Sequence, residues 1–516
     1  MLNRLQFDAE PTWTADRLRE CLAAHYAGES IVVLSNREPL RHDHAPDGTI
    51  VVRRSAGGLV TALEPLVQTC AGVWVAHGAG TADRVVIEER DGLGVPIGNR
   101  QYRLRRVWLD AREERGYYYG FANEALWPLC HRAHVAPIFR QDDFEMYVAA
   151  NERFADAAGD EVETDSPLVM VQDYHLALVP RMLRRRLRQS AIITFWHIPF
   201  PHPRDFAVCP WSREILEGLL GSSIVGFQTP DDCRNFIDAA ERQAGAGVNC
   251  ARNVLVHRGR QISVRAYPVS IEWPNRWVSQ SPPIQTCRAD VRRSLDLPSD
   301  IRLAVGIDRL DYTKGINEKF LAVERLLETC PEFRERFVFV QIAEPSRDGL
   351  ASYRELRLRL QKSAERINSR LGRGRYRPIV LLEARHEPAD VFRFFRAADV
   401  CYVGSLHDGM NLVAKEFVSA RDDAKGVLIL SEFAGAAREL TTALIVNPYA
   451  PDDCARALAT ALTMSQEEQT NRMRAMRAVI SRFNAYRWAG EMLVDAARTR
   501  SQAERPPTQI RSMASR

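Results

Sequence analysis

The chain has 516 residues, of which 46% are hydrophobic, and its 70 Lys and Arg nearly balance 66 Asp and Glu, leaving a net charge of +4. One hydrophobic core rarely serves so long a chain, so we expect two or more domains. Because charges of both signs are interspersed, the composition argues against a protein that wraps nucleic acid or coats a membrane. A local basic cleft stays compatible with it.

Neither a membrane helix nor a secretion signal is expected. Uncharged apolar runs such as residues 191–200 are far shorter than the roughly 20 residues of a membrane span. The first 13 residues carry acidic side chains and no apolar segment, unlike a signal peptide. Ten scattered cysteines form no C-x-x-C pair, which argues against a zinc ribbon or a disulfide framework. Reduced thiols in the cytoplasm are the favoured interpretation.

Short apolar runs, each followed by a turn and a helical pattern, recur along the chain. The runs are mostly continuous rather than alternating, which is typical of parallel strands buried on both faces. Strand followed by helix, repeated many times, predicts doubly wound α/β sheets. Strands are expected at residues 30–35, 168–172, 191–196 and 223–228, and then at residues 302–307, 337–342, 378–382, 400–403, 427–431 and 443–446. Helices are expected at residues 179–188, 317–328, 350–370 and 388–398.

A Pro-bearing, polar break at residues 272–298 separates the two sets of strands. We therefore expect two Rossmann-like doubly wound domains that face a central cleft. The first would span residues 1–275 and bind the acceptor, and the second would span residues 276–485 and bind a nucleotide-sugar donor. Residues 486–516 would form the end of a C-terminal helix and a disordered tail.

The sequence lacks the motifs of several other α/β enzymes. No G-x-G-x-x-G follows a strand, and no P-loop motif is present. His386 and Glu387 do not start a zinc-binding H-E-x-x-H helix, because Pro388 follows them. No Asp-x-Asp triplet is present that would hold a divalent cation against a diphosphate. Positive side chains and helix ends would therefore have to neutralise such a ligand.

Two cations follow the predicted strand at residues 302–307. Arg309 and Lys314 stand five residues apart across a turn, at the strand end where open α/β sheets bind ligands. Together they can converge on a diphosphate and stabilise a leaving group without metal. Surface ion pairs with Asp308 and Asp311 are an equally open interpretation.

A glycine-bearing turn precedes a predicted helix at residues 412–420. Gly409 and Asn411 permit a tight turn with exposed backbone amides, and the helix N-terminus attracts anions. Asp408 can accept sugar hydroxyls, and Glu416 can hold a ribose. A capped helix end with a glutamate on its face is the alternative.

Polar residues also follow two successive strands predicted in the first half. Asp173 and His175 come after one strand and His197 after the next, so they are expected to face one crevice. Buried structural histidines are the alternative. The aromatic stretch at residues 117–128 predicts either plain core or rings on which sugars stack.

Taken in this order, the segments resemble the trehalose-6-phosphate synthase family of retaining GT-B-type glycosyltransferases, over residues 31–492. The resemblance rests on residues 35–37, 56–59, 118 with 127, 173–175, 197–199, 309–315, 341–343 with 346–347, 408–416 and 433–437. It implies metal-independent transfer of glucose from UDP-glucose to glucose 6-phosphate with retention, giving trehalose 6-phosphate and UDP, without a further cofactor. It also implies a front-face path, in which the departing phosphate takes the proton of the incoming hydroxyl.

The resemblance implies a role for each matching residue. Those at the reacting centre would be Arg309, Lys314, Asp173 and His197. The donor would be bound by Gly57, Gly58, Arg309, Lys314, His386, Asp408, Gly409, Met410, Asn411, Leu412, Val413, Ala414, Lys415 and Glu416. The acceptor would be bound by Arg37, His77, Tyr118, Trp127, Asp173 and Arg347.

One residue departs from the family pattern. His77 stands where a W-x-G-W-like stretch usually has its second Trp, and this loss of a large ring bears on the acceptor. Glycerol 3-phosphate, the acceptor of related glucosylglycerol-phosphate synthases, is therefore the main alternative, and a non-catalytic sugar-phosphate-binding relative is the second. No nucleic-acid or membrane partner is implied. A homo-oligomer, either a dimer or a tetramer, is possible. A separate trehalose-phosphate phosphatase is expected.

Overall fold

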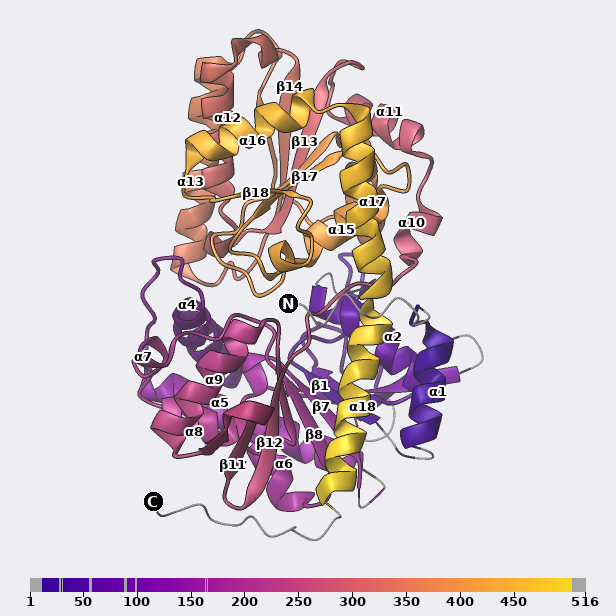
Figure 1. Ribbon diagram of the computed structural model, residues 1–516, viewed down its shortest axis with the longest axis vertical. Coiled ribbons are helices and arrows are strands. Elements are labelled where there is room, and N and C mark those ends of the chain that lie inside the picture. Colours follow the sequence, from indigo (N-terminus) through magenta and orange to yellow (C-terminus); the bar gives the residue numbers. More distant parts are fainter. Residues whose placement is uncertain are drawn as a thin grey trace.

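Two large sheets, one in each half of the molecule, organise the chain (Figure 1). The computed structural model describes residues 12–503 apart from residues 27, 28, 30, 55–57, 88–90, 98, 99, 163 and 165. None of the helices in this described part combines the length and the hydropathy that crossing a bilayer requires.

The first sheet has ten strands in the order β10-β11-β12-β9-β8-β7-β1-β4-β6-β5. At its centre, β1 (Ile31–Ser35), β7 (Leu168–Gln172), β8 (Ala191–Phe195) and β9 (Ile224–Phe227) run parallel and are buried along their whole length. They confirm the four strands predicted for this half, because strands covered on both faces read as continuous apolar runs.

The other six strands of this sheet were not predicted from the sequence. They are β4 (Val73–His77), β5 (Gly92–Ile97), β6 (Arg100–Val107), β10 (Gly247–Asn249), β11 (Val254–His257) and β12 (Arg260–Ala266). Two of them, β6 and β12, carry arginines, and three of the pairings are antiparallel, so these strands lack the continuous apolar signature. In contrast, β4 is a largely buried apolar strand that pairs in parallel with β1 and β6, and it was missed despite its pattern. A separate antiparallel hairpin joins β2 (Leu40–His44) to β3 (Ile50–Arg54).

The second sheet is parallel throughout, and each of its six strands was predicted. Its order is β15 (Ile379–Leu382), β14 (Phe337–Glu344), β13 (Arg302–Arg309), β16 (Val400–Val403), β17 (Val427–Ser431) and β18 (Leu444–Val446).

Helices connect these strands. In the first half they are α1 (Ala15–His25), α2 (Gly58–Cys70), α3 (Ala111–Glu114), the π-helix η3 (Arg115–Leu126), α4 (Trp127–Cys130), α5 (Gln141–Asp160), η4 (Tyr174–Leu176), α6 (Val179–Arg186), α7 (Pro203–Phe206), α8 (Ser212–Leu219), α9 (Pro230–Ala244) and η5 (Cys250–Arg252). After them come α10 (Arg276–Gln280), α11 (Ile284–Ser294), η6 (Tyr312–Lys314), α12 (Ile316–Thr329), η7 (Pro331–Phe333), α13 (Ala351–Leu371), α14 (Pro388–Ala397), α15 (Leu412–Ala420), η8 (Gly435–Arg438), α16 (Pro451–Thr463), α17 (Gln466–Arg482) and α18 (Ala485–Ala503). The five predicted helices correspond to α6, α12, α13, α14 and α15.

The last helix crosses back to the first sheet. In Figure 1, α17 lies beside the upper sheet, whereas α18 runs down the lower half, where it packs against α1, α2 and β8. The Tyr26 hydroxyl donates to the Leu493 carbonyl at 2.8 Å, and Arg500 pairs with Glu29 at 2.7 Å. Residues 485–503 therefore pack with the beginning of the chain. The predicted tail beyond residue 503 lies outside the described residues.

A buried ionic network ties the β2–β3 hairpin to the first sheet. Arg106, on β6, contacts the Glu38 carboxylate, lies 2.7 Å from the Asp83 carboxylate and donates to the Leu40 carbonyl at 3.2 Å. The side chains of Arg106 and Asp83 are 0% exposed. Because Glu38 directly follows Arg37, this network also fixes the segment that carries Arg37.

Replacing Arg106 with Met should leave two buried carboxylates without a counter-charge. We expect the free energy of unfolding of the first half to fall by about 3–5 kcal/mol, measured by denaturant titration with tryptophan fluorescence. Arg103→Met, on the same strand, is the matched control. Arg103 is 30% exposed, and its partner Glu161 would still have a counter-charge, because Arg105 lies 3.5 Å from the Glu161 carboxylate. It should cost about 1 kcal/mol or less. Equal losses in the two variants would contradict a special role for the buried network.

Candidate active site

Strand ends from both sheets line one cavity of about 310 Å³. From the first half come residues that follow β1, β7 and β8, and from the second half come residues at the ends of β13 and β14 and at the start of α15. Ligands of doubly wound sheets bind at the carboxyl ends of parallel strands. The cavity therefore occupies the place where both sheets offer polar groups.

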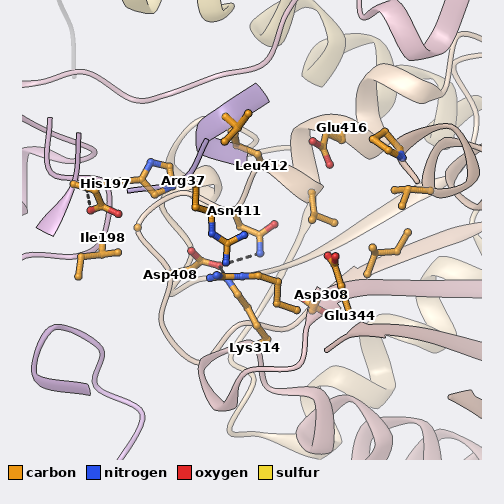
Figure 2. A pocket seen from close by; sticks show the side chains of 18 of the residues that line it. Arg37, His197, Ile198, Asp308, Lys314, Glu344, Asp408, Asn411, Leu412 and Glu416 are labelled. Atoms are coloured by element: carbon orange, nitrogen blue, oxygen red, sulfur yellow. Dashed lines mark hydrogen bonds and ion pairs between the residues drawn. The ribbon is translucent and has the colours of Figure 1, made fainter. Parts of the chain in front are cut away.

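On the second-half side, three side chains converge on the Asp408 carboxylate, and Figure 2 shows two of them, Lys314 and Asn411. Lys314 Nζ lies 2.5 Å from Asp408 Oδ2, and Asn411 Nδ2 and Ser405 Oγ donate to the same oxygen at 3.1 and 3.2 Å. Burial alone would raise the pKa of Asp408, but the charge of Lys314 outweighs it and holds the pKa well below its usual range. Asp408 is therefore a fixed anion at the cavity wall.

The helix that follows is α15, whose bounds match the predicted helix at residues 412–420. Asn411 both lines the cavity and caps this helix, because its Oδ1 accepts the Ala414 N–H at 3.3 Å. The two interpretations left open by the sequence are thus compatible. Leu412, Val413 and Glu416 also line the cavity, and burial raises the pKa of Glu416 to about 7.

Some residues of this segment do not line the cavity. Met410 and Ala414 are buried and absent from its described lining. Lys415 is also buried, with its ammonium bound to the Val269 carbonyl at 2.8 Å and to Glu439 at 2.6 Å. Its side chain joins the second half to the end of the first, so a donor contact through the ammonium has no support here.

The alternative interpretation of Arg309 and Lys314, as ion-pair partners of Asp308 and Asp311, is not observed among the described residues. Asp308 pairs instead with Lys319 at 2.5 Å, and Asp311 pairs with Arg347 at 2.8 Å. Within the described part of the chain, no carboxylate forms an ion pair with Arg309, whose guanidinium lies 5.5 Å from the centre of the Trp127 ring. Both cations of the predicted diphosphate site line the cavity.

Positive charge is also concentrated at the end of the cavity around Tyr118. Tyr118 lies on the π-helix η3 and stacks on His175 with ring centres 5.8 Å apart. Burial disfavours its phenolate, yet Arg37 and Arg347 outweigh that effect and lower the pKa of Tyr118 to about 8. A buried phenol ionises this readily only beside concentrated positive charge. This end therefore suits an anionic group of a ligand.

Trp127 and Arg347 form the floor of this positive end. The Arg347 guanidinium lies 4.2 Å from the Trp127 ring centre and also contacts the Tyr353 hydroxyl. Held by Asp311, it is a pre-oriented cation rather than a mobile surface side chain.

Asp173 and His197 also line the cavity and contact each other. Asp173 Oδ1 accepts the His197 N–H at 3.0 Å, and burial raises the pKa of Asp173 to about 6 against the opposing effect of backbone hydrogen bonds and Arg309. Gln228 Oε1 accepts the Val269 N–H, which turns its Nε2 toward His197 Nδ1 at 3.2 Å. Burial lowers the pKa of His197 to about 4, so the neutral ring carries its proton on Nε2.

Three cavity residues have left-handed backbone that side chains rarely adopt. Asp173 has φ 72° and ψ 170°, Asn411 has φ 74°, and Arg347 has φ 54°. The Asp173 conformation is essentially restricted to glycine elsewhere, and such strain clusters at functional sites. The surrounding structure holds these three side chains in place against their backbone preference.

Other predicted residues have different locations. His386 lines the cavity. Gly58 follows the β2–β3 hairpin and is the first residue of α2, and Gly57 lies outside the described residues. His77, at the end of β4, is 7% exposed and is absent from the described lining, so an acceptor contact through it stays a prediction.

Several lining residues were missed from the sequence. Asn36 and Gln172 adjoin the predicted residues Arg37 and Asp173, and His131 follows the end of α4, which starts at Trp127, so their positions at strand or helix ends could have indicated them. The segment from Glu272 to Trp277 was interpreted as a break between domains, and no local pattern in it indicates a site. It nevertheless lines the cavity through Glu272, Asn275, Arg276 and Trp277.

Comparison with known proteins identifies the family of this chain. The sequence pattern of glycosyltransferase family 20 matches residues 29–498. A trehalose-6-phosphate synthase of Mycobacterium sp. (strain KMS) is 40% identical over 496 residues, which cover 93% of this chain and 97% of the relative.

Solved structures are similar over most of their length. A UDP-forming alpha,alpha-trehalose-phosphate synthase from Burkholderia xenovorans in complex with glucose-6-phosphate has a TM-score of 0.80 at 32% identity, covering 90% of this chain and 99% of that chain. An E. coli structure described as trehalose-6-phosphate bound with UDP-2-fluoro glucose has a TM-score of 0.79 at 33% identity, covering 91% and 99%. The predicted α/β fold of GT-B type is confirmed. On the match over residues 29–498, this chain belongs to glycosyltransferase family 20.

Proposed function

We propose that this chain transfers glucose from UDP-glucose to glucose 6-phosphate with retention at the anomeric carbon, forming trehalose 6-phosphate and UDP. The observation that carries the proposal is one cavity lined from both halves of the chain by four cations, Arg37, Arg309, Lys314 and Arg347. A transfer between a nucleoside diphosphate sugar and a sugar phosphate needs positive charge for two anionic groups. The names of the relatives support the same substrates.

The donor would lie against the second sheet. Arg309 and Lys314 would neutralise its diphosphate, together with the exposed N–H groups at the start of α15. Asp408 is a fixed anion, so its carboxylate accepts hydrogen bonds and cannot donate them. It would accept from the hydroxyl groups of the glucosyl ring and so orient the ring. Glu416, one turn further along α15, would accept from the ribose hydroxyls.

The acceptor would place its phosphate at the positive end of the cavity. Arg37 and Arg347 would bind the phosphate oxygens, and Tyr118 would donate its phenol proton to one of them. Trp127 would pack against the sugar ring, since carbohydrate C–H faces stack on aromatic surfaces. The acceptor hydroxyl at C1 would then face Asp173 and His197.

In the reaction, a bond forms between the acceptor C1 oxygen and the donor C1 carbon, while the bond from that carbon to the β-phosphate oxygen breaks. The acceptor proton passes to the departing phosphate on the same face, which preserves the configuration. Arg309 and Lys314 stabilise the charge that develops on the phosphate. The fixed Asp173 carboxylate and the His197 Nε2–H orient the sugar hydroxyls.

The reason for considering glycerol 3-phosphate as the acceptor has no support from the described cavity. It arose from His77, and that residue is absent from the described cavity lining.

We further propose that the protein acts in the cytoplasm, which is supported by nine described cysteines that are all free. We also propose that a separate phosphatase releases trehalose. A dimer or tetramer stays a prediction, as do the domain limits at residues 275 and 485.

The direct test is product analysis with UDP-, GDP- and ADP-glucose, each offered with glucose 6-phosphate or glycerol 3-phosphate. We expect nucleotide release and an α,α-linked disaccharide phosphate by NMR only with glucose 6-phosphate, fastest with UDP-glucose. Because Arg309 and Lys314 are proposed to act in place of a metal, excess EDTA should leave the rate unchanged. No disaccharide with any pair would refute the proposed function, and loss of activity in EDTA would refute metal independence.

Lys314→Ala and Arg309→Ala should each lower kcat by about 10²–10³-fold, the cost of losing one preorganised charge at a developing oxyanion. Lys362→Ala, an exposed lysine of α13, is the matched control and should keep the wild-type rate. Circular dichroism would confirm that the variants fold. Wild-type turnover in either site variant would contradict the diphosphate role.

Arg37→Ala should act on the acceptor alone. Loss of one charged contact to a phosphate should raise the KM for glucose 6-phosphate by about 10–100-fold, with the affinity for UDP unchanged in calorimetry. Tyr118→Phe removes one donor and should raise the same KM by a smaller factor. An unchanged acceptor KM, or an equal loss of UDP affinity, would move the phosphate site elsewhere.

A further inference from the structure

One buried amide in the cavity has no partner. Gln172 is the last residue of β7, lines the cavity and is 0% exposed. Among the described residues, neither its Nε2 nor its Oε1 has a hydrogen-bond partner. Most buried side-chain amides are satisfied, so two orphaned atoms on one side chain need a physical explanation.

Comparable amides nearby are engaged. Gln341, on β14, donates through Nε2 to Asp308 at 3.1 Å and to the Ile342 carbonyl at 2.8 Å, and only its Oε1 has no partner among the described residues. Gln228 uses both ends of its amide on Val269 and His197. Gln172 differs because neither end of its amide has a partner in the described protein, although the residue lines the cavity.

The position of β7 places this amide between the two proposed substrates. β7 lies between β1, which leads to Arg37, and β8, which leads to His197. The next residue is the strained Asp173, whose carboxylate is already held by the His197 N–H. Gln172 therefore faces the zone where the two sugar rings would meet.

The chemistry of an amide selects the kind of group it binds. A phosphate oxygen only accepts hydrogen bonds, so it would satisfy Nε2 and leave Oε1 facing negative charge. A sugar hydroxyl both donates and accepts, and neighbouring hydroxyls on one ring can satisfy both ends of the amide.

We propose that Gln172 binds hexose hydroxyls at the junction of donor and acceptor, with Nε2 donating and Oε1 accepting, and so selects for a hexose in that position. This inference rests on the proposed glucosyl transfer. It makes Gln172 a specificity-determining residue, beside the charged groups that hold the phosphates.

The first test is Gln172→Met, which keeps the length of the side chain and removes both polar atoms. We expect kcat/KM to fall about tenfold or more, as for a lost hydrogen bond to bound substrate. The melting temperature of the free enzyme should stay the same or rise, since two unpaired buried groups are removed. A structural role for Gln172 would instead lower the melting temperature together with the activity.

The matched control is Gln243→Met on α9. Gln243 Oε1 also lacks a partner among the described residues, but Gln243 is absent from the described cavity lining. Its rate should equal that of wild type. A loss in Gln243→Met as large as in Gln172→Met would overturn the inference, because the effect would then not come from the site.

Deoxy analogues identify the sugar that is bound. Glucose 6-phosphate and UDP-glucose, each lacking one ring hydroxyl in turn, would be assayed with wild type and with Gln172→Met. The analogue without the contacted hydroxyl should lose rate in wild type and lose much less in the variant. A coupled acceptor hydroxyl or a coupled donor hydroxyl supports the inference and names the source.

Two failures are distinguishable. If wild type forms the disaccharide phosphate but Gln172→Met keeps full kcat/KM, or no deoxy analogue couples to it, the amide makes no substrate contact and the inference is wrong. If wild type forms no disaccharide, the proposed function fails first.

Discussion

The backbone of the loop at residues 408–411 lies very close to the backbone of the segment after β8. The space between them leaves no room for a side chain. A Cβ at Gly409 would lie 2.3 Å from the His197 carbonyl oxygen, and one at Gly435 would lie 2.0 Å from the Gly409 carbonyl oxygen. Both Gly409 and Gly435 must therefore be glycine, because a Cβ at either position would clash with the neighbouring backbone. Because Asp408 and His197 belong to different sheets, this approach is what assembles one site from two halves of the chain.

The distribution of buried charge then decides which cations serve substrates. Lys319 neutralises Asp308, and Lys415 neutralises Glu439, so both ammonium groups hold structure in place. Arg347 is oriented by Asp311 but still faces the cavity, and Lys314 pairs with Asp408, which is itself a cavity residue. Low dielectric strengthens each of these interactions, so anions of a ligand would meet fixed rather than mobile charge.

Local pattern predicted much of this molecule. The fully buried parallel strands and the helix α15 were found because continuous apolar runs and a glycine-bearing turn have local signatures. The strands β6 and β12 were missed, since their arginines interrupt the continuous apolar run. Strand ends also indicated Asp173, His197 and Lys314, whereas Trp277 lies in a segment whose local pattern indicates only a break between domains.

The sequence alone determined the α/β class, the strands of both cores and the residues at their carboxyl ends, because burial periodicity and turn chemistry are local properties. Tertiary structure alone decided which polar groups are already paired. In the folded chain the Lys415 ammonium binds the Val269 carbonyl, and His77 is absent from the described cavity lining. Gln172 lines the cavity, and its amide has no partner among the described residues. Such pairing depends on distances between residues far apart in the chain, and no local spacing encodes those distances.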